Sequence, residues 1–104
     1  MGITRRHAEV VAALRRSVLE APGVTDTATR QRAFDGEVSG DEGPLARYLA
    51  MVHNRSAYIT DSMVEEARAA GASEDELFEL TIAAATGEAF RRLDAGLRAM
   101  GVTE

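Results

Sequence analysis

Residues 66–80 constrain the fold of this chain more than any other segment. The segment begins as a helical run and reaches Gly71, which can take the left-handed conformation that ends a helix without a steric penalty. After a short joint, Ser73 can act as the N-cap of a new helix, and Glu76 three residues later completes a capping box. The segment therefore predicts one helix that ends at Gly71 and another that begins after Ser73.

Apolar residues recur at helical spacing over most of the chain, and no strand-like alternation is present. Thr25 or Asp26 can cap a second helix, and Pro44 suits the first turn of a third. The predicted helices cover residues 3–20, 26–34, 44–53, 60–71 and 73–100. We therefore expect an all-α fold in a single domain, residues 1–104. Helices and an acidic loop occupy residues 1–43, and the remaining helices occupy residues 44–100.

The last predicted helix carries apolar residues on two faces. One stripe consists of Phe78, Ile82, Ala85, Ala89, Leu93 and Leu97, and the other of Leu77, Leu80, Ala84 and Gly87. A helix that is apolar on more than one side is central in its domain or faces another subunit. Small residues would let helices of neighbouring subunits approach closely, and these are Ala83, Ala84, Ala85 and Gly87. We therefore expect a homo-oligomer. The first predicted helix has a single stripe, formed by Ile3, His7, Val10, Val11, Leu14 and Val18.

The net charge and the residue composition argue against several classes of function. The net charge of −5 disfavours binding to nucleic acid or to an anionic membrane. Without Cys, the chain has no disulfide, no thiolate nucleophile and no Cys-ligated metal. The two histidines, His7 and His53, lack a nearby partner at metal-ligand spacing, so we expect no metal or other cofactor. We also expect neither a membrane span nor a signal peptide, and hence a cytoplasmic protein.

The arrangement of helices resembles the carboxymuconolactone decarboxylase and AhpD-like alkylhydroperoxidase superfamily. The resemblance covers roughly residues 45–100, and its most specific part is the run from Ala67 to Leu80, an Ala-Gly joint followed by a Ser cap and acidic residues. It implies an AhpD-like helical domain of about five to six helices that assembles as a trimer or a hexamer.

Three positions depart from the motif of that superfamily. AhpD-like members carry a Cys-x-x-Cys pair and a His at the start of the helix that ends here at Gly71. Counting back from this glycine places Ser56, Ile59 and Met63 at these positions. A Ser hydroxyl neither ionises near neutral pH nor cycles through a disulfide, so thiol peroxidase chemistry is excluded at this site. The decarboxylases keep the His for proton transfer, and Met63 cannot replace it.

The resemblance places a cleft around the start of the fourth predicted helix. Tyr58 could donate a hydrogen bond to a carbonyl or carboxylate there, with Asp61 or His53 as the base. Ser56 and Met63 would line the cleft. Structural roles compete with these functions: Tyr58 as a partly buried ring, Asp61 as a helix-capping carboxylate, and His53 as a hydrogen-bonded helix residue.

Glu79, Arg91 and Arg92 form a second candidate cluster. Glu79 lies between apolar residues, so we expect it to be partly buried and to need a partner. An Arg of the same or a neighbouring subunit could supply that partner as a structural ion pair. In the functional alternative, the Arg pair holds a small carboxylate ligand.

Two functions remain open after these considerations. A DNA-binding helix-turn-helix is rejected, because its recognition helix would present Glu74, Asp75 and Glu76 to a polyanion. The first remaining hypothesis is a cysteine-free, oligomeric domain that binds a small ligand or a partner protein. The alternative is a lyase or isomerase that acts on a small carboxylic acid through Tyr58, Asp61 or His53. Whether the chain is an enzyme is left open by the sequence.

Overall fold

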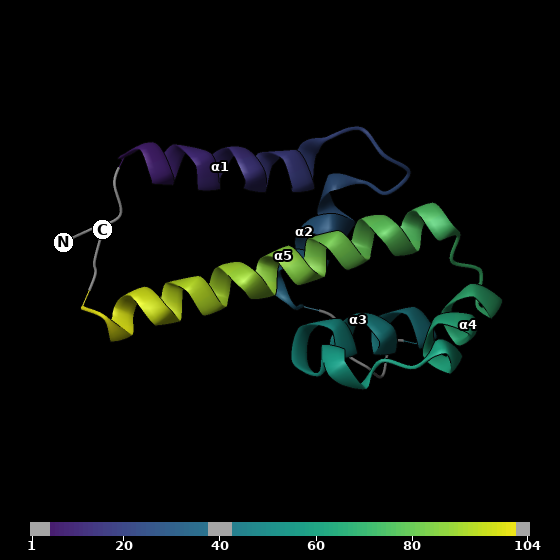
Figure 1. Cartoon of the computed structure of the whole chain (residues 1–104). Helices are drawn as coiled ribbons and strands as arrows, with labels where there is room; N and C mark the ends of the chain where they lie inside the picture. Colours follow the sequence, from purple (N-terminus) through teal and green to yellow (C-terminus); the bar gives the residue numbers. More distant parts are fainter. Residues whose placement is uncertain (1–4, 38–42, 102–104) are drawn as a thin grey trace.

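The computed structural model describes residues 5–37 and 43–101, and this part of the chain is entirely helical apart from its connections. The described residues form five α-helices, labelled in Figure 1, and a short 3₁₀-helix. In chain order they are α1 (Arg5–Glu20), α2 (Thr27–Asp35), α3 (Pro44–Asn54), η2 (Ser56–Tyr58), α4 (Asp61–Ala69) and α5 (Glu74–Ala99). The prediction of an all-α fold is confirmed. The predicted residue Ile3 and most of the predicted acidic loop lie outside the described residues.

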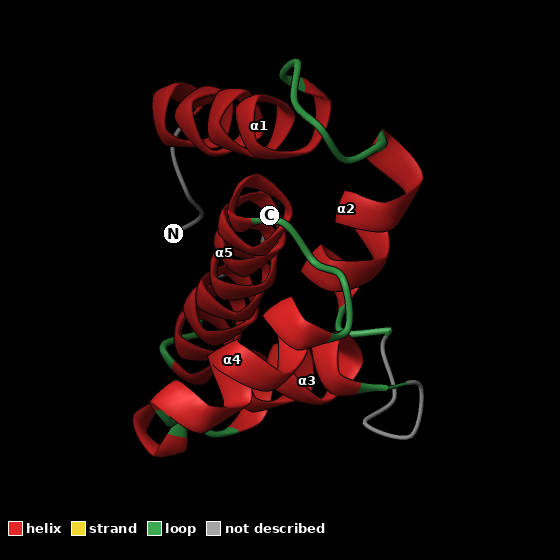
Figure 2. Cartoon of the chain, turned by 90° about the vertical axis from the view of Figure 1, so that its right-hand side faces the viewer, coloured by secondary structure: helices red, strands yellow, loops and turns green. Residues whose placement is uncertain are grey.

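Helix α5 is the central element of the fold (Figure 1). Helices α1, α2 and α3 all contact it, and α4 packs against α3. Figure 2 shows α2 on one side of α5, with α1 above it and α3 and α4 below. The opposite side of α5 carries no other helix of the described chain (Figure 2). One long face of the central helix is therefore left without cover by the domain itself.

The start of α5 follows the local chemistry of its residues. Ser73 accepts a hydrogen bond from the backbone of Glu76, and the Glu76 carboxylate accepts one from the backbone of Ser73. Gly71 has the expected left-handed conformation, with φ of 110°. Thr60 rather than Asp61 is the N-cap of α4, and Asp26 rather than Thr25 is the N-cap of α2. The predicted helix boundaries around these caps are confirmed.

The hydrophobic core lies where α2, α3 and α5 meet. Its buried apolar side chains include Phe34 of α2, Leu49 and Val52 of α3, and Leu77 and Leu80 of α5. Burying a side chain of this size contributes roughly 1.5–3 kcal/mol relative to exposure. The core therefore fastens α2 and α3 to one side of α5.

The two apolar stripes of α5 have different environments. The stripe of Leu77, Leu80, Ala84 and Gly87 is buried in the core. Three large residues of the other stripe are exposed: Phe78 at 67%, Ile82 at 41% and Leu93 at 45%. Of the small residues expected at a subunit interface, Ala85 is exposed, whereas Ala83, Ala84 and Gly87 are buried within the domain. That part of the expectation was wrong, because these three positions lie inside the domain, where Gly87 meets the backbone of Phe34 in α2.

The buried face of α1 also differs from the predicted stripe. Leu19 is buried and Val18 is half-buried, whereas Val10 and Leu14 are largely exposed. Helix α1 meets α5 and α2 mainly through its C-terminal half, so the apolar residues nearer its N-terminus remain uncovered.

The chain exposes more surface than its mass predicts. Its accessible area is 6863 Å², whereas a compact monomer of this mass exposes about 5700 Å². Its radius of gyration is 15.0 Å, compared with about 13 Å for a compact domain of similar length. In the part of the chain that is described, no helix is both long and apolar enough to cross a membrane.

Candidate functional site

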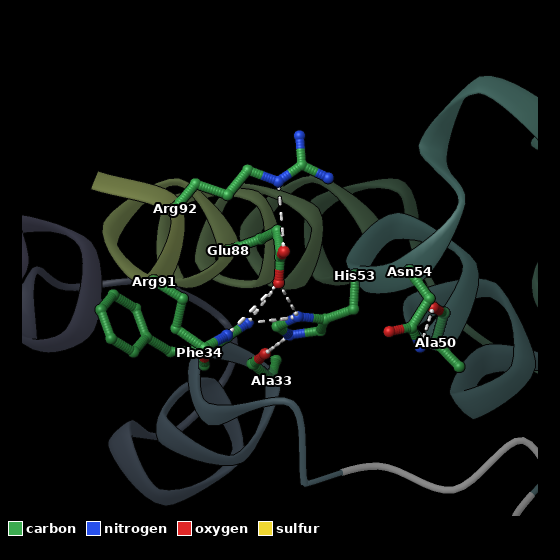
Figure 3. Close-up of polar contacts among 8 residues, drawn as sticks. All are labelled: Ala33, Phe34, Ala50, His53, Asn54, Glu88, Arg91 and Arg92. Carbon is green, nitrogen blue, oxygen red and sulfur yellow. Dashed lines mark hydrogen bonds and ion pairs between the residues drawn. The ribbon is translucent and has the colours of Figure 1, made fainter. Parts of the chain in front are cut away.

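The polar side chains nearest to a functional site surround His53, at the end of α3 (Figure 3). The imidazole is 5% exposed and lies between α2 and α5. Its Nε2 atom lies within hydrogen-bond distance of the carbonyl oxygen of Ala33, and its Nδ1 atom meets Arg91 Nη2. Glu88, one helical turn before Arg91, completes the cluster.

These contacts fix the proton on the His53 ring. The carbonyl of Ala33 can only accept, so Nε2 must carry the proton. Arg91 can only donate, so Nδ1 must accept through its lone pair. Glu88 Oε2 lies farther from Nδ1, at 3.4 Å, and that contact becomes a hydrogen bond only when Nδ1 is protonated. The geometry is therefore that of a neutral histidine with both nitrogens engaged.

Two arginines of α5 hold the carboxylate of Glu88. Arg91 Nη2 lies 3.0 Å from Oε2, and Arg92 Nε lies 3.2 Å from Oε1. Burial raises the pKa of Glu88, but the hydrogen bonds from Arg91 and Arg92 and the charge of Arg91 outweigh it. The pKa of Glu88 is consequently below its ordinary value, and the group is a carboxylate at neutral pH.

The same cluster closes the C-terminal end of α2. The carbonyls of the last helical turn lack partners within the helix and carry partial negative charge. Arg91 Nη1 donates to the carbonyl of Phe34 at 3.0 Å, and His53 binds that of Ala33. Figure 3 shows both side chains directed at this turn. The His53–Glu88–Arg91 cluster thus joins α2, α3 and α5 through polar contacts. Its imidazole has no free lone pair to act as a general base.

The other predicted cleft residues do not join His53. Tyr58 is 67% exposed, and the guanidinium of Arg55 lies over its ring, 5.8 Å from the centroid. Ser56 and Asp61 are exposed, and Met63 is half-buried in the first turn of α4. The structure therefore separates the proposed hydrogen-bond donor Tyr58 from the proposed base His53.

Glu79 has different partners from those expected. Its carboxylate accepts hydrogen bonds from the backbone N–H groups of Val24 and Thr25, at 2.8 and 2.9 Å, and from the Thr25 hydroxyl at 2.6 Å. The Thr25 hydroxyl and the two backbone groups lower the pKa of Glu79 to about 2. The expected partner of Glu79 was an Arg of the same or a neighbouring subunit, but within the chain Val24 and Thr25 bind its carboxylate, and Arg91 and Arg92 bind Glu88 instead.

Arg30 is a buried charged residue that the sequence did not reveal. It is 6% exposed, and its guanidinium donates to the carbonyls of Ala21, at 2.7 Å, and Thr25, at 2.9 Å. A weaker bond reaches Val18 near the end of α1. Arg30 and Glu79 together fix the connection between α1 and α2. The sequence carried no periodic signal for this role, because Arg30 lies in a short, largely polar helix.

Glu88 was also missed, although the sequence held a signal for it. It precedes Arg91 by three positions and Arg92 by four, the spacing at which opposite charges meet on a helix. Among the described residues, no group of three His, Asp or Glu side chains is arranged to hold a metal ion.

Comparisons of this chain with protein-family models, with curated proteins and with solved structures find no match.

Proposed function

We propose that this chain is a homo-oligomeric domain that binds a small ligand or a partner protein, rather than a thiol peroxidase. The observation that carries the proposal is the exposure of Phe78, Ile82 and Leu93 along one stripe of the central helix. Monomeric soluble proteins rarely leave a continuous apolar stripe in water, and such surfaces normally mark an interface. The absence of Cys from the whole chain removes thiol chemistry from consideration.

The surface area of the isolated chain supports the same proposal. It is 6863 Å², which exceeds the area of a compact monomer by about 1200 Å². Each partner in a standard protein interface buries ~800 Å². Association with another chain through the exposed apolar residues of α5 would therefore bury part of this surface.

Membership in the AhpD-like and carboxymuconolactone decarboxylase superfamily is part of the proposal. It rests on the run from Ala67 to Leu80 and on the caps that this run forms at Gly71 and Ser73. The resemblance implies a trimer or a hexamer. The alternative, a lyase or isomerase for a small carboxylic acid, is not favoured by the geometry, because His53 is engaged on both nitrogens and lies apart from Tyr58.

Light scattering tests the proposal directly. At micromolar concentration the protein should have the mass of two or more subunits of 11.2 kDa. Phe78→Gln should lower that mass while the circular dichroism of the helices stays unchanged. Tyr58→Gln is the matched control, since Tyr58 is equally exposed but lies outside α5. A folded wild-type chain with the mass of one subunit would refute the proposal.

A further inference from the structure

We infer that the exposed stripe of α5 packs against the same stripe of a second copy, with the two helices antiparallel. This inference rests on the proposed function and names the partner and its orientation. We define the α5 stripe as the exposed residues Phe78, Ile82, Ala85, Ala89 and Leu93. They are spaced by three or four positions, so they form a continuous line along one side of the helix.

Residue size along the α5 stripe suits a pairing of this kind. Large side chains lie toward its two ends, Phe78 and Ile82 at one and Leu93 at the other, and the small residues Ala85 and Ala89 lie between them. In an antiparallel pair, Phe78 of one copy lies opposite Leu93 of the other, and Ile82 lies opposite Ala89. Ala85 then lies beside the two-fold axis, where its small side chain lets the helices approach.

The charge distribution of α5 selects the antiparallel direction. Its first turn carries Glu74, Asp75 and Glu76, and its last turns are net positive, with Arg92 and Arg98 beside the single acid Asp94. Antiparallel packing brings the acidic turn of each copy close to these arginines of the other, and it also opposes the two helix dipoles favourably. Parallel packing would instead place the acidic turns side by side.

Helix α1 provides a groove for the exposed ring of Phe78. A groove of about 360 Å³ lies between α1 and the C-terminal half of α5, and its walls are largely apolar. It is lined by Val11, Phe90, Leu93 and Leu97, among other residues. Because Phe78 of the second copy lies opposite Leu93 in the antiparallel pair, its ring reaches this groove. Each copy thus offers both the projecting side chain and the groove that receives it, as a two-fold interface requires.

Cysteine cross-linking can distinguish the two directions, because the natural chain contains no Cys. Ala85→Cys should form a disulfide-linked dimer by itself under mild oxidation. Ile82→Cys alone and Ala89→Cys alone should not, since each Cys would lie ~10 Å from its own copy along the helix axis, beyond the reach of a disulfide. An equal mixture of these two variants should cross-link. Ala28→Cys, exposed on α2, is the control that should stay monomeric on the denaturing gel.

The outcomes separate this inference from the proposed function. The antiparallel pair would be overturned if Ile82→Cys and Ala89→Cys each cross-linked with themselves as strongly as Ala85→Cys does. An isolated trimer would also overturn it. An oligomer by light scattering with no cross-link at any stripe position would also overturn it, but would leave the proposed function intact. A monomer would refute both.

Charge exchange gives a second test that needs no disulfide. Asp75→Arg and Arg98→Glu should each weaken self-association about tenfold at low salt, because each places like charges opposite one another. Mixing the two variants should restore wild-type association. Failure of the mixture to exceed either variant alone would contradict the antiparallel direction.

Discussion

Gly87 lies directly against the backbone of Phe34, at the point where α5 crosses α2, and the carbonyl of Phe34 fills the space that a side chain at position 87 would take. The same carbonyl accepts a hydrogen bond from Arg91, one turn farther along α5. The closest contact between the two helices and the His53–Glu88–Arg91 cluster are therefore one continuous structure. Its geometry depends on the absence of a single methyl group.

Gly87→Ala should destabilise the protein by about 3 kcal/mol, because the backbone of α2 would have to move. Urea unfolding followed by circular dichroism measures this change. Gly96→Ala is the control on the same helix, since a Cβ there meets no atom within 4 Å. It should stabilise the fold by about 0.5–1 kcal/mol through helix propensity. Equal stability of the two variants would contradict the close crossing.

Acid should weaken the connection between α1 and α2 through Glu79. Its pKa is about 2 in the folded chain and 4.5 as the ordinary value. A folded pKa below the unfolded one stabilises the fold above the unfolded pKa, and this contribution is lost as the pH falls through the folded pKa. Glu79→Gln should therefore be less stable than the wild type above pH 4.5. The difference should shrink toward pH 2. Thermal unfolding across this pH range measures the stability difference between Glu79→Gln and the wild type, and Asp75→Asn is the control. If Glu79 had no such role, that difference would stay constant with pH.

Arg30→Met should cost about 3 kcal/mol of stability, because it leaves the carbonyls of Ala21 and Thr25 without their donor in a buried place. Arg30→Lys should recover only part of the loss, since one ammonium cannot reproduce the planar fork of donors. Arg92→Met is the exposed control and should change stability by less than about 1 kcal/mol. Chemical denaturation measures the stability of each variant. Equal stability of Arg30→Met and Arg92→Met would contradict this role of Arg30.

The neutral ring of His53 should carry its proton on Nε2. Long-range nitrogen–proton NMR spectra of the imidazole distinguish the two tautomers. Arg91→Met removes the donor to Nδ1, and we expect it to shift the Nδ1 resonance while the proton stays on Nε2 and is still donated to the carbonyl of Ala33. A proton on Nδ1 in the neutral wild-type ring would show that Glu88, rather than Arg91, is its partner.

Much of the helical organisation could be predicted from local sequence. Ser73 and Glu76 bind each other within one turn of chain, so their capping box needs no tertiary partner. Pro44 begins α3 for a similar reason, because its ring fixes the backbone for a first helical turn. These interactions span a few residues and are encoded where they act.

The candidate site was predictable only in part. Local spacing favoured helical positions for His53, Arg91 and Arg92, and the helices were found there. The partner of Glu79 could not be read from the chain, because its hydrogen bonds come from Val24 and Thr25, more than fifty positions away in the sequence. The pairing of His53 with Arg91 likewise depends on how α3 lies against α5.

The sequence by itself determined the helices, their caps and the two apolar stripes of α5, since each follows from contacts within a turn or two of chain. Only the tertiary structure decided which stripe forms the core. Both stripes are apolar enough for burial, but α2 crosses α5 at Gly87, where a side chain would meet the backbone of Phe34. That approach buries Leu80 and Ala84 and leaves Phe78, Ile82 and Leu93 exposed.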